Sequence, residues 1–169
     1  MSDSRQREQQ HGPADGDTDD AVSRSGAGNY LVVRLAGREF AIPSAAVRAM
    51  VALRGAEAGM MTMGADGQML ARVEGRVMPL VSVHQLLGLR TSPVGARSCL
   101  VLLAHPDSAI LPSFAIIADS ISRIERIRKE DWRVDDSQQW IAAQVKLGEK
   151  WRGVLEPARL SRVPGCRAA

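Results

Sequence analysis

The feature that most constrains the fold of this chain is a series of short segments in which apolar and polar residues alternate. In the first of them Leu31, Val33 and Leu35 fall on one face, because successive side chains of a β-strand point to opposite sides. A turn at 36–38 follows, and the alternation resumes over 40–42. This pattern predicts a β-hairpin and not a helix.

A second hairpin is predicted over 70–83. Glu74 and Gly75 would form its turn, and Pro79 marks an edge or a bulge because proline cannot donate to a strand ladder. The second strand is expected to run into a short helical turn that Gly88 closes.

Later segments predict more strands. Two continuous apolar runs, 99–104 and 114–118, are typical of strands that are buried on both faces. Residues 121–127 predict a further extended or bulged segment, and 141–155 predict a last hairpin.

Two stretches of the chain share one loose plan, in which a hairpin with a glycine turn is followed by an apolar strand and a short turn that ends in leucine. Residues 82–87 and 155–160 are the corresponding ends. About nine short strands and almost no helix predict an all-β fold, as a sandwich or a barrel, with two similar subdomains.

The segment between the two first hairpins has no clear period. Ser44 could cap a short helical turn over 45–50, or these residues could form an irregular strand. Residues 54–69, which combine glycines with methionines, predict a loop with turns. The methionines are interpreted as gap-fillers at the margin of a core, with a partner surface as the alternative.

Charge divides the chain into two parts. Residues 1–28 hold three basic and six acidic residues, a net charge of −3, and predict a disordered tail. The remaining residues hold 19 basic and 13 acidic side chains, a net charge of +6. Residues 165–169 are expected to form a short C-terminal tail.

The basic body allows two interpretations. One is a small β-barrel that binds nucleic acid through phosphate contacts. The other is a solubilising surface that also suits an acidic protein partner, and we favour it because the arginines are scattered. The one basic cluster, 123–129, is interrupted by Glu125 and has no interleaved aromatics for base stacking.

The sequence contains no recognisable catalytic or metal-binding motif. Residues 15–19 imitate the start of a calcium loop, but Asp20 and Gly26 stand where the turn glycine and the bidentate glutamate belong. His84 could be imagined in a triad with Asp119 and Ser82, but no spacing brings these residues together, so a surface histidine is expected. We therefore predict no catalytic residue, no metal and no cofactor.

Cysteine usage and hydropathy favour the cytoplasm. Cys99 and Cys166 are far apart and belong to no paired motif. Neither an N-terminal apolar segment nor a run of about 18 apolar residues occurs, so neither a signal peptide nor a membrane span is expected.

Three motifs in order resemble the CheW-like domain family. The first is 35–43 followed by Val47, the second is 75–81 followed by 86–89, and the third is 114–121. The resemblance covers residues 30–160. It implies a domain over 29–164 built from two pseudo-symmetric five-stranded SH3-like β-barrels with short helical turns.

The resemblance also implies a function without catalysis. Proteins of this family are adaptors that join the cytoplasmic tip of a chemoreceptor to the regulatory domain of a CheA-type histidine kinase. Such a chain would meet the membrane only through receptors and would not bind nucleic acid. Its pathway could be chemotaxis or twitching motility.

Candidate partner residues come from two of the motifs. For a receptor-facing groove we predict Val47, Arg48 and Met50, with core packing as the alternative for Val47 and Met50. For a kinase-facing turn we predict Glu74, Gly75 and Arg76, with a turn chosen for backbone shape as the alternative. The chain departs from the family pattern at Glu74, where arginine is usual, and at 82–84, where the pattern is Asp-Leu-Arg.

Overall fold

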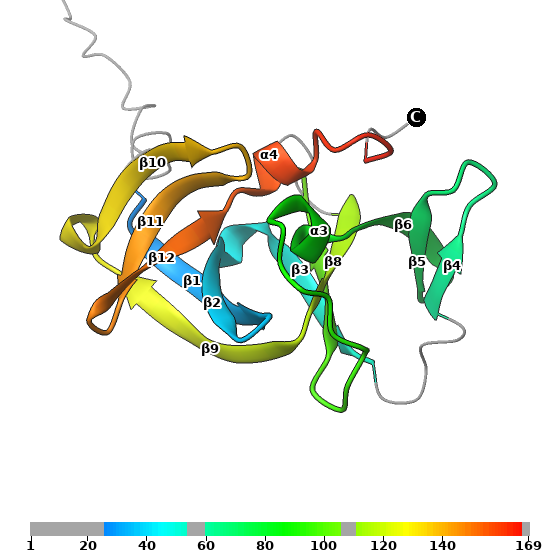
Figure 1. Cartoon of the computed structure of the whole chain (residues 1–169), viewed down its shortest axis with the longest axis horizontal. Helices are drawn as coiled ribbons and strands as arrows, with labels where there is room; N and C mark the ends of the chain where they lie inside the picture. Colours follow the sequence, from blue (N-terminus) through cyan, green and yellow to red (C-terminus); the bar gives the residue numbers. More distant parts are fainter. Residues whose placement is uncertain (1–25, 54–59, 106–110, 167–169) are drawn as a thin grey trace, which may run out of the picture.

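The computed structural model describes residues 26–53, 60–105 and 111–166, which form two six-stranded sheets with short helices (Figure 1). The predicted all-β fold is confirmed. Each sheet contains six strands, where the expected barrel has five. Most of the two predicted tails lies outside the described residues.

The first sheet takes its strands from both ends of the described chain, in the order β10-β11-β12-β2-β1-β9. Its strands are β1 (Gly28–Leu35), β2 (Arg38–Pro43), β9 (Ser120–Ile127), β10 (Trp132–Gln138), β11 (Ile141–Leu147) and β12 (Lys150–Leu155). Neighbours are antiparallel except β12 and β2, which pair in parallel at Val154 and Ala41.

The second sheet takes its strands from the middle of the chain, in the order β3-β7-β8-β6-β5-β4. They are β3 (Val47–Ala52), β4 (Met61–Met63), β5 (Met69–Val73), β6 (Arg76–Val81), β7 (Cys99–Leu103) and β8 (Phe114–Ala118). Here β6 and β8 form the parallel pair, with Leu80 opposite Ala115.

The two sheets repeat one arrangement. From one edge, each has two antiparallel pairs, then a parallel pair, then two more antiparallel pairs. A short helix follows the corresponding strand in each half: α3 (Val83–Leu86) follows β6, and α4 (Pro157–Leu160) follows β12. The two similar halves expected from the sequence are therefore present. The chain crosses between them from β2 to β3 and from β8 to β9.

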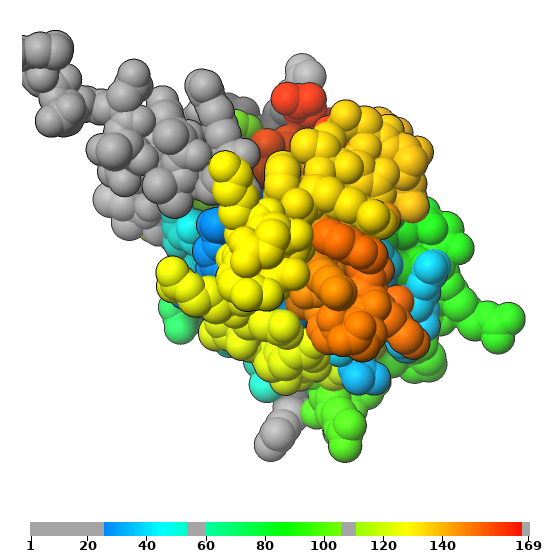
Figure 2. Space-filling view, turned by 90° about the vertical axis from the view of Figure 1, so that its left-hand side faces the viewer, coloured from blue at the N-terminus to red at the C-terminus, as the bar shows by residue number. Residues whose placement is uncertain are grey.

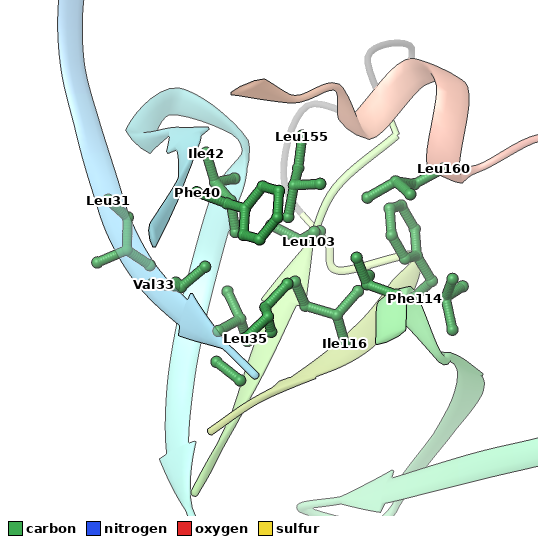
Figure 3. Packing of buried hydrophobic residues seen from close by; sticks show 14 of the residues in the cluster. Leu31, Val33, Leu35, Phe40, Ile42, Leu103, Phe114, Ile116, Leu155 and Leu160 are labelled. Carbon is green, nitrogen blue, oxygen red and sulfur yellow. The ribbon is translucent and has the colours of Figure 1, made fainter. Parts of the chain in front are cut away.

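Burial on both faces of the central strands divides the core into three clusters. In β1, Leu31 and Val33 face the cluster between the sheets, whereas Tyr30 and Val32 face a cluster of the first sheet. The alternation of side chains along a strand makes this possible. Figure 3 shows the central cluster, where Phe114 of β8 lies close to Leu160 of α4.

The β1–β2 hairpin turns through Ala36 and Gly37, both with positive φ, at +50° and +76°. This is the conformation of a type I′ turn, whose twist matches the flanking strands. A side chain added at Gly37 would meet no neighbour within 4 Å, so only the backbone conformation favours glycine.

Gly37→Ala is therefore expected to lower the free energy of unfolding by about 1–2 kcal/mol, the cost of the left-handed conformation for an L-residue. Urea denaturation measures the change. Gly95→Ala is the matched control, because Gly95 lies outside the positive-φ region and its nearest neighbour atom would be 4.0 Å away. Equal losses in the two variants would contradict the turn assignment.

The structure corrects the sequence analysis around 44–69 and 132–138. The predicted Ser44 cap is wrong, because the 3-10 helix η1 (Ser44–Ala46) has Pro43 as its N-cap and no side-chain cap. Met61–Met63, assigned to a loop, pairs with β5 instead. Strand β10 was not predicted. It follows the 3-10 helix η2 (Lys129–Asp131).

Helix α3 ends as the sequence predicts. The Gly88 N–H donates to the Gln85 carbonyl oxygen, and the Leu89 N–H donates to the His84 carbonyl oxygen. Gly88 has a φ of +63°, as the Schellman motif requires. In the described part of the chain, no helix has the length and apolar character needed to span a bilayer.

Candidate functional site

The first predicted group of partner residues lies on β3, an edge strand of the second sheet. Val47 is partly buried against the central core cluster. Met50 is 47% exposed and stands opposite Val101 of β7. Packing therefore accounts for Val47, whereas Met50 presents an apolar side chain to solvent.

Arg48 points elsewhere, because the register of β3 against β7 shifts between Val47 and Ala49. Its Nη1 donates to the Ala45 carbonyl oxygen at 2.6 Å. The side chain lines a hollow of about 640 Å³ where the two halves meet. The three residues of this predicted group thus face different surroundings.

The second predicted group forms the exposed turn of the β5–β6 hairpin. Glu74 and Gly75 have φ of +50° and +76°, and Val73 pairs with Arg76 around them. Gly75 suits this type I′ turn, but asparagine or glycine would fit the Glu74 position at lower cost. Turn geometry therefore does not require a glutamate at this position.

The sheet keeps the two groups apart. Strands β7, β8 and β6 lie between β3 and β5. Both groups nevertheless belong to one hydrogen-bonded sheet, so their relative positions are fixed by the ladder. This arrangement suits two separate contacts better than one shared pocket.

The structure adds exposed apolar residues that the prediction did not assign to a site. Val77 is 51% exposed on β6, two residues from Gly75. Met63 and Met69 form an exposed cross-strand pair between β4 and β5. Met60 and Met61 instead pack against the core of the second sheet, as gap-fillers do. The run of methionines in the sequence pointed to both groups. It could not show which methionines are exposed and which pack on the core.

The basic cluster at 123–129 covers the second half of β9, an edge strand of the first sheet, and the two residues that follow it. Figure 2 shows the outer side of this sheet, with β9 and β10 in yellow. Arg123 pairs with Glu39 at 2.9 Å and with Glu125 at 2.8 Å. Arg128 pairs with Glu130 and Asp131. Carboxylates in these contacts compete with phosphate for the guanidinium groups, which weakens the nucleic-acid alternative.

Glu39 is the carboxylate at the centre of this charged face. Burial on its own would raise its pKa, but the hydrogen bond from Arg123 and the charges of Arg123, Arg34 and Arg152 together hold that pKa below its usual value. The contribution of Glu39 to stability is therefore present above its unfolded pKa and is lost as the pH falls through its lower folded value.

Comparison with known proteins identifies the family. The model of the CheW-like domain matches residues 29–164, which is most of the chain. The chain belongs to the CheW-like domain family. The fold is similar to that of the scaffolding protein TtCheW from Thermoanaerobacter tengcongensis, with a TM-score of 0.67 and 13% sequence identity. The match covers 82% of this chain and 95% of that chain. No curated protein sequence matches this chain.

His84 stands where the CheW-like pattern has an arginine, and the structure corrects its assignment as a surface residue. It is 6% exposed, and its Nε2 lies 3.1 Å from the Asp119 carboxylate. Asp119 Oδ2 also accepts the Ala36 N–H at 2.7 Å. The pair thus joins α3 of the second half to the β1–β2 turn of the first, a contact between segments far apart in sequence.

His84 and Asp119 do not form a nucleophilic triad with Ser82. Within the described residues the Ser82 hydroxyl makes no hydrogen bond to His84. Nor do any three His, Cys, Asp or Glu side chains of the described ranges group closely enough to hold a metal ion. The contacts of His84 and Asp119 support packing between the halves of the CheW-like domain.

Proposed function

We propose that this CheW-like chain is a non-catalytic adaptor that couples chemoreceptors to a CheA-type histidine kinase. The match of the family model over 29–164 carries the proposal. The similarity to a solved protein described as scaffolding supports it. The chain would act in the cytoplasm and reach the membrane only through its receptor.

The proposal places the receptor tip and the kinase on different parts of the second sheet. The receptor tip contacts the β3 edge, with Met50 as the exposed contact and Val47 and Arg48 as its neighbours on the strand. The regulatory domain of the kinase contacts the turn at Glu74, Gly75 and Arg76, next to the exposed Val77. Strands β7 and β8 lie between the β3 edge and the β5–β6 turn, which allows both partners to bind at once.

An adaptor of this kind acts by geometry. Ligand occupancy at the receptor would bias the kinase through the positions of the two bound partners. A coupling free energy of roughly 1–3 kcal/mol is typical of such linkage between sites. A rigid sheet between the contacts transmits a displacement better than a flexible linker does.

Glu74→Arg is expected to weaken binding to the cognate kinase regulatory domain by about tenfold or more, because a reversed charge at a contact opposes the complementary surface. The melting temperature should change by no more than a few degrees, since Glu74 is exposed. Isothermal titration calorimetry measures the affinity, and calorimetric melting measures the stability.

Glu149→Arg is the matched control. Glu149 is exposed in the β11–β12 turn, the position in the first sheet that corresponds to the β5–β6 turn. Glu149→Arg makes the same charge change on the other half of the molecule. The affinity for the kinase domain should therefore stay within about twofold of that of the unmodified chain. If both variants weaken binding equally, or if Glu74→Arg loses fold and binding together, the kinase-facing assignment is wrong.

A further inference from the structure

One hollow among the described residues lies where the two halves meet. We call it the junction hollow. It has a volume of about 640 Å³ and is bounded by the start of β1, by η1, by the start of β11 and by Glu156 before α4. Arg48 and His105 border it from the second half. A hollow of this size lies within the range that holds small molecules or short peptide segments.

Glu156 places a carboxyl group in this hollow without a partner cation. Burial raises its pKa, and the hydrogen bond from the Ala158 N–H and the charge of Arg159 oppose that rise only in part. Within the described ranges Glu156 forms no ion pair. The Arg159 guanidinium is engaged by Asp136 at 3.0 Å and by the Ile141 carbonyl oxygen at 3.0 Å.

Aromatic side chains stand beside Glu156 on the wall of the hollow. Burial and, after it, the charge of Glu156 raise the pKa of Tyr30 to about 12, and both residues line the hollow. The Tyr30 hydroxyl donates to the Gly26 carbonyl oxygen at 2.7 Å. Trp132 covers Gly26 so closely that a Cβ there would come within 2.2 Å of its ring.

The hollow also holds an unsatisfied hydroxyl group. Ser44 Oγ is fully enclosed, and among the described residues it has no hydrogen-bond partner. Buried polar groups without partners are uncommon because desolvation costs free energy that no contact returns. Glu156 and Ser44 both line the hollow, but the enclosed Ser44 hydroxyl is not open to a ligand there.

We infer that the junction hollow binds a ligand with an ammonium or guanidinium group and an apolar body. Glu156 supplies the counter-ion, and the partly exposed Trp132 supplies an aromatic face that attracts cations. The ligand can come from a free small cation or from a lysine or arginine side chain of a polypeptide. Arg48 also lines the hollow and repels a cation, so the cation must bind next to Glu156.

This inference goes beyond the adaptor function and does not depend on it, although the hollow shares Arg48 with the proposed receptor-facing group. The arrangement also gives a reason for an acidic residue at position 156. A glutamine would fill the same space without the burial cost of a charge. Glu156 is therefore better suited to a ligand than to stability.

Titration of the full chain with n-butylguanidinium, followed by NMR, tests the inference. We expect saturable shifts at the Gly26, Asn29 and Ala143 amides, which line the hollow. The neutral analogue n-butylurea at matched ionic strength should bind at least tenfold more weakly. Glu156→Gln should bind n-butylguanidinium at least tenfold more weakly than the unmodified chain does. Equal affinities for the two probes would overturn the inference. So would equal affinities of the unmodified chain and of Glu156→Gln for n-butylguanidinium.

A second measurement needs no variant. The carboxyl carbon of Glu156 is followed against pH with and without n-butylguanidinium. Binding of a cation stabilises the carboxylate, so the midpoint should move to lower pH. An unchanged midpoint at saturating probe would contradict the inference even if Glu156→Gln failed to fold.

A blocked tripeptide with a central arginine then distinguishes the two sources of the cation, a free small molecule and a polypeptide side chain. Affinity at least tenfold above that of n-butylguanidinium identifies a polypeptide side chain. Equal or weaker affinity identifies a free small cation. Both results support a cation site, whereas failure of every cationic probe rejects it. Kinase binding, measured in the same samples, shows whether the adaptor function stands or fails separately.

Discussion

Phe114→Ala is expected to lower the free energy of unfolding by about 3–5 kcal/mol, which is a large part of the stability of a typical domain. Phe114 is fully buried in the cluster between the two sheets and comes from β8, whose neighbours are β7 and β6. Removing its ring leaves a cavity where both halves meet. Urea denaturation measures the loss.

Ile124→Ala provides the control for this prediction. Ile124 is also an apolar strand residue, but it is 63% exposed on β9. Its truncation should change the free energy of unfolding by no more than about 0.5 kcal/mol. If Phe114→Ala cost less than 1 kcal/mol, the cluster between the sheets could not be the main core.

Asp119→Ala should give the second largest loss, about 2–4 kcal/mol. It deprives two groups of their acceptor: the Ala36 N–H, at 2.7 Å, and the buried His84 ring, at 3.1 Å. Asp119→Asn keeps the shape and one acceptor oxygen, so its loss should be roughly half as large. Chemical denaturation at pH 7 compares the variants.

A double-mutant cycle with His84→Ala isolates the contact between the halves. Residues in one hydrogen-bond network show coupling energies of about 0.5–3 kcal/mol. We therefore expect His84→Ala to cost less in the Asp119→Ala background than in the unmodified chain. Strict additivity of the two losses would show that the 3.1 Å contact does not stabilise the fold.

Local patterns were sufficient to predict much of the fold. The alternation in β1 and β2 and the glycine turns at 37 and 75 specify hairpins through short-range geometry alone. The continuous apolar runs at β7 and β8 correctly predicted burial on both faces. What these runs face, two separate clusters on either side, follows only from the packing of the sheets.

Other elements depend on contacts that no local pattern encodes. Strand β10, Trp132–Gln138, is polar and mostly exposed, and it is a strand because it pairs with β11. Strand β4 is three residues long and pairs only with β5. His84 and Asp119 are 35 residues apart, and the crossover from β8 to β9 brings them together.

The candidate partner residues show the same limit. The family motif located Glu74 and Gly75, and the structure places them at an exposed turn. The motif could not distinguish Val47, which packs on the core, from Met50, which is exposed. Glu156 carried no signal at all, because its position in the junction hollow depends on η1, β10 and β12 together.

The most direct test of the adaptor function asks whether one chain holds both partners at once. Analytical ultracentrifugation of this chain with the kinase regulatory domain and a soluble receptor tip from the same organism should show a three-component complex. Met50→Glu should remove only the receptor tip, and Glu74→Arg only the kinase domain. Competition between the two partners for this chain, or binding of neither, would contradict the account.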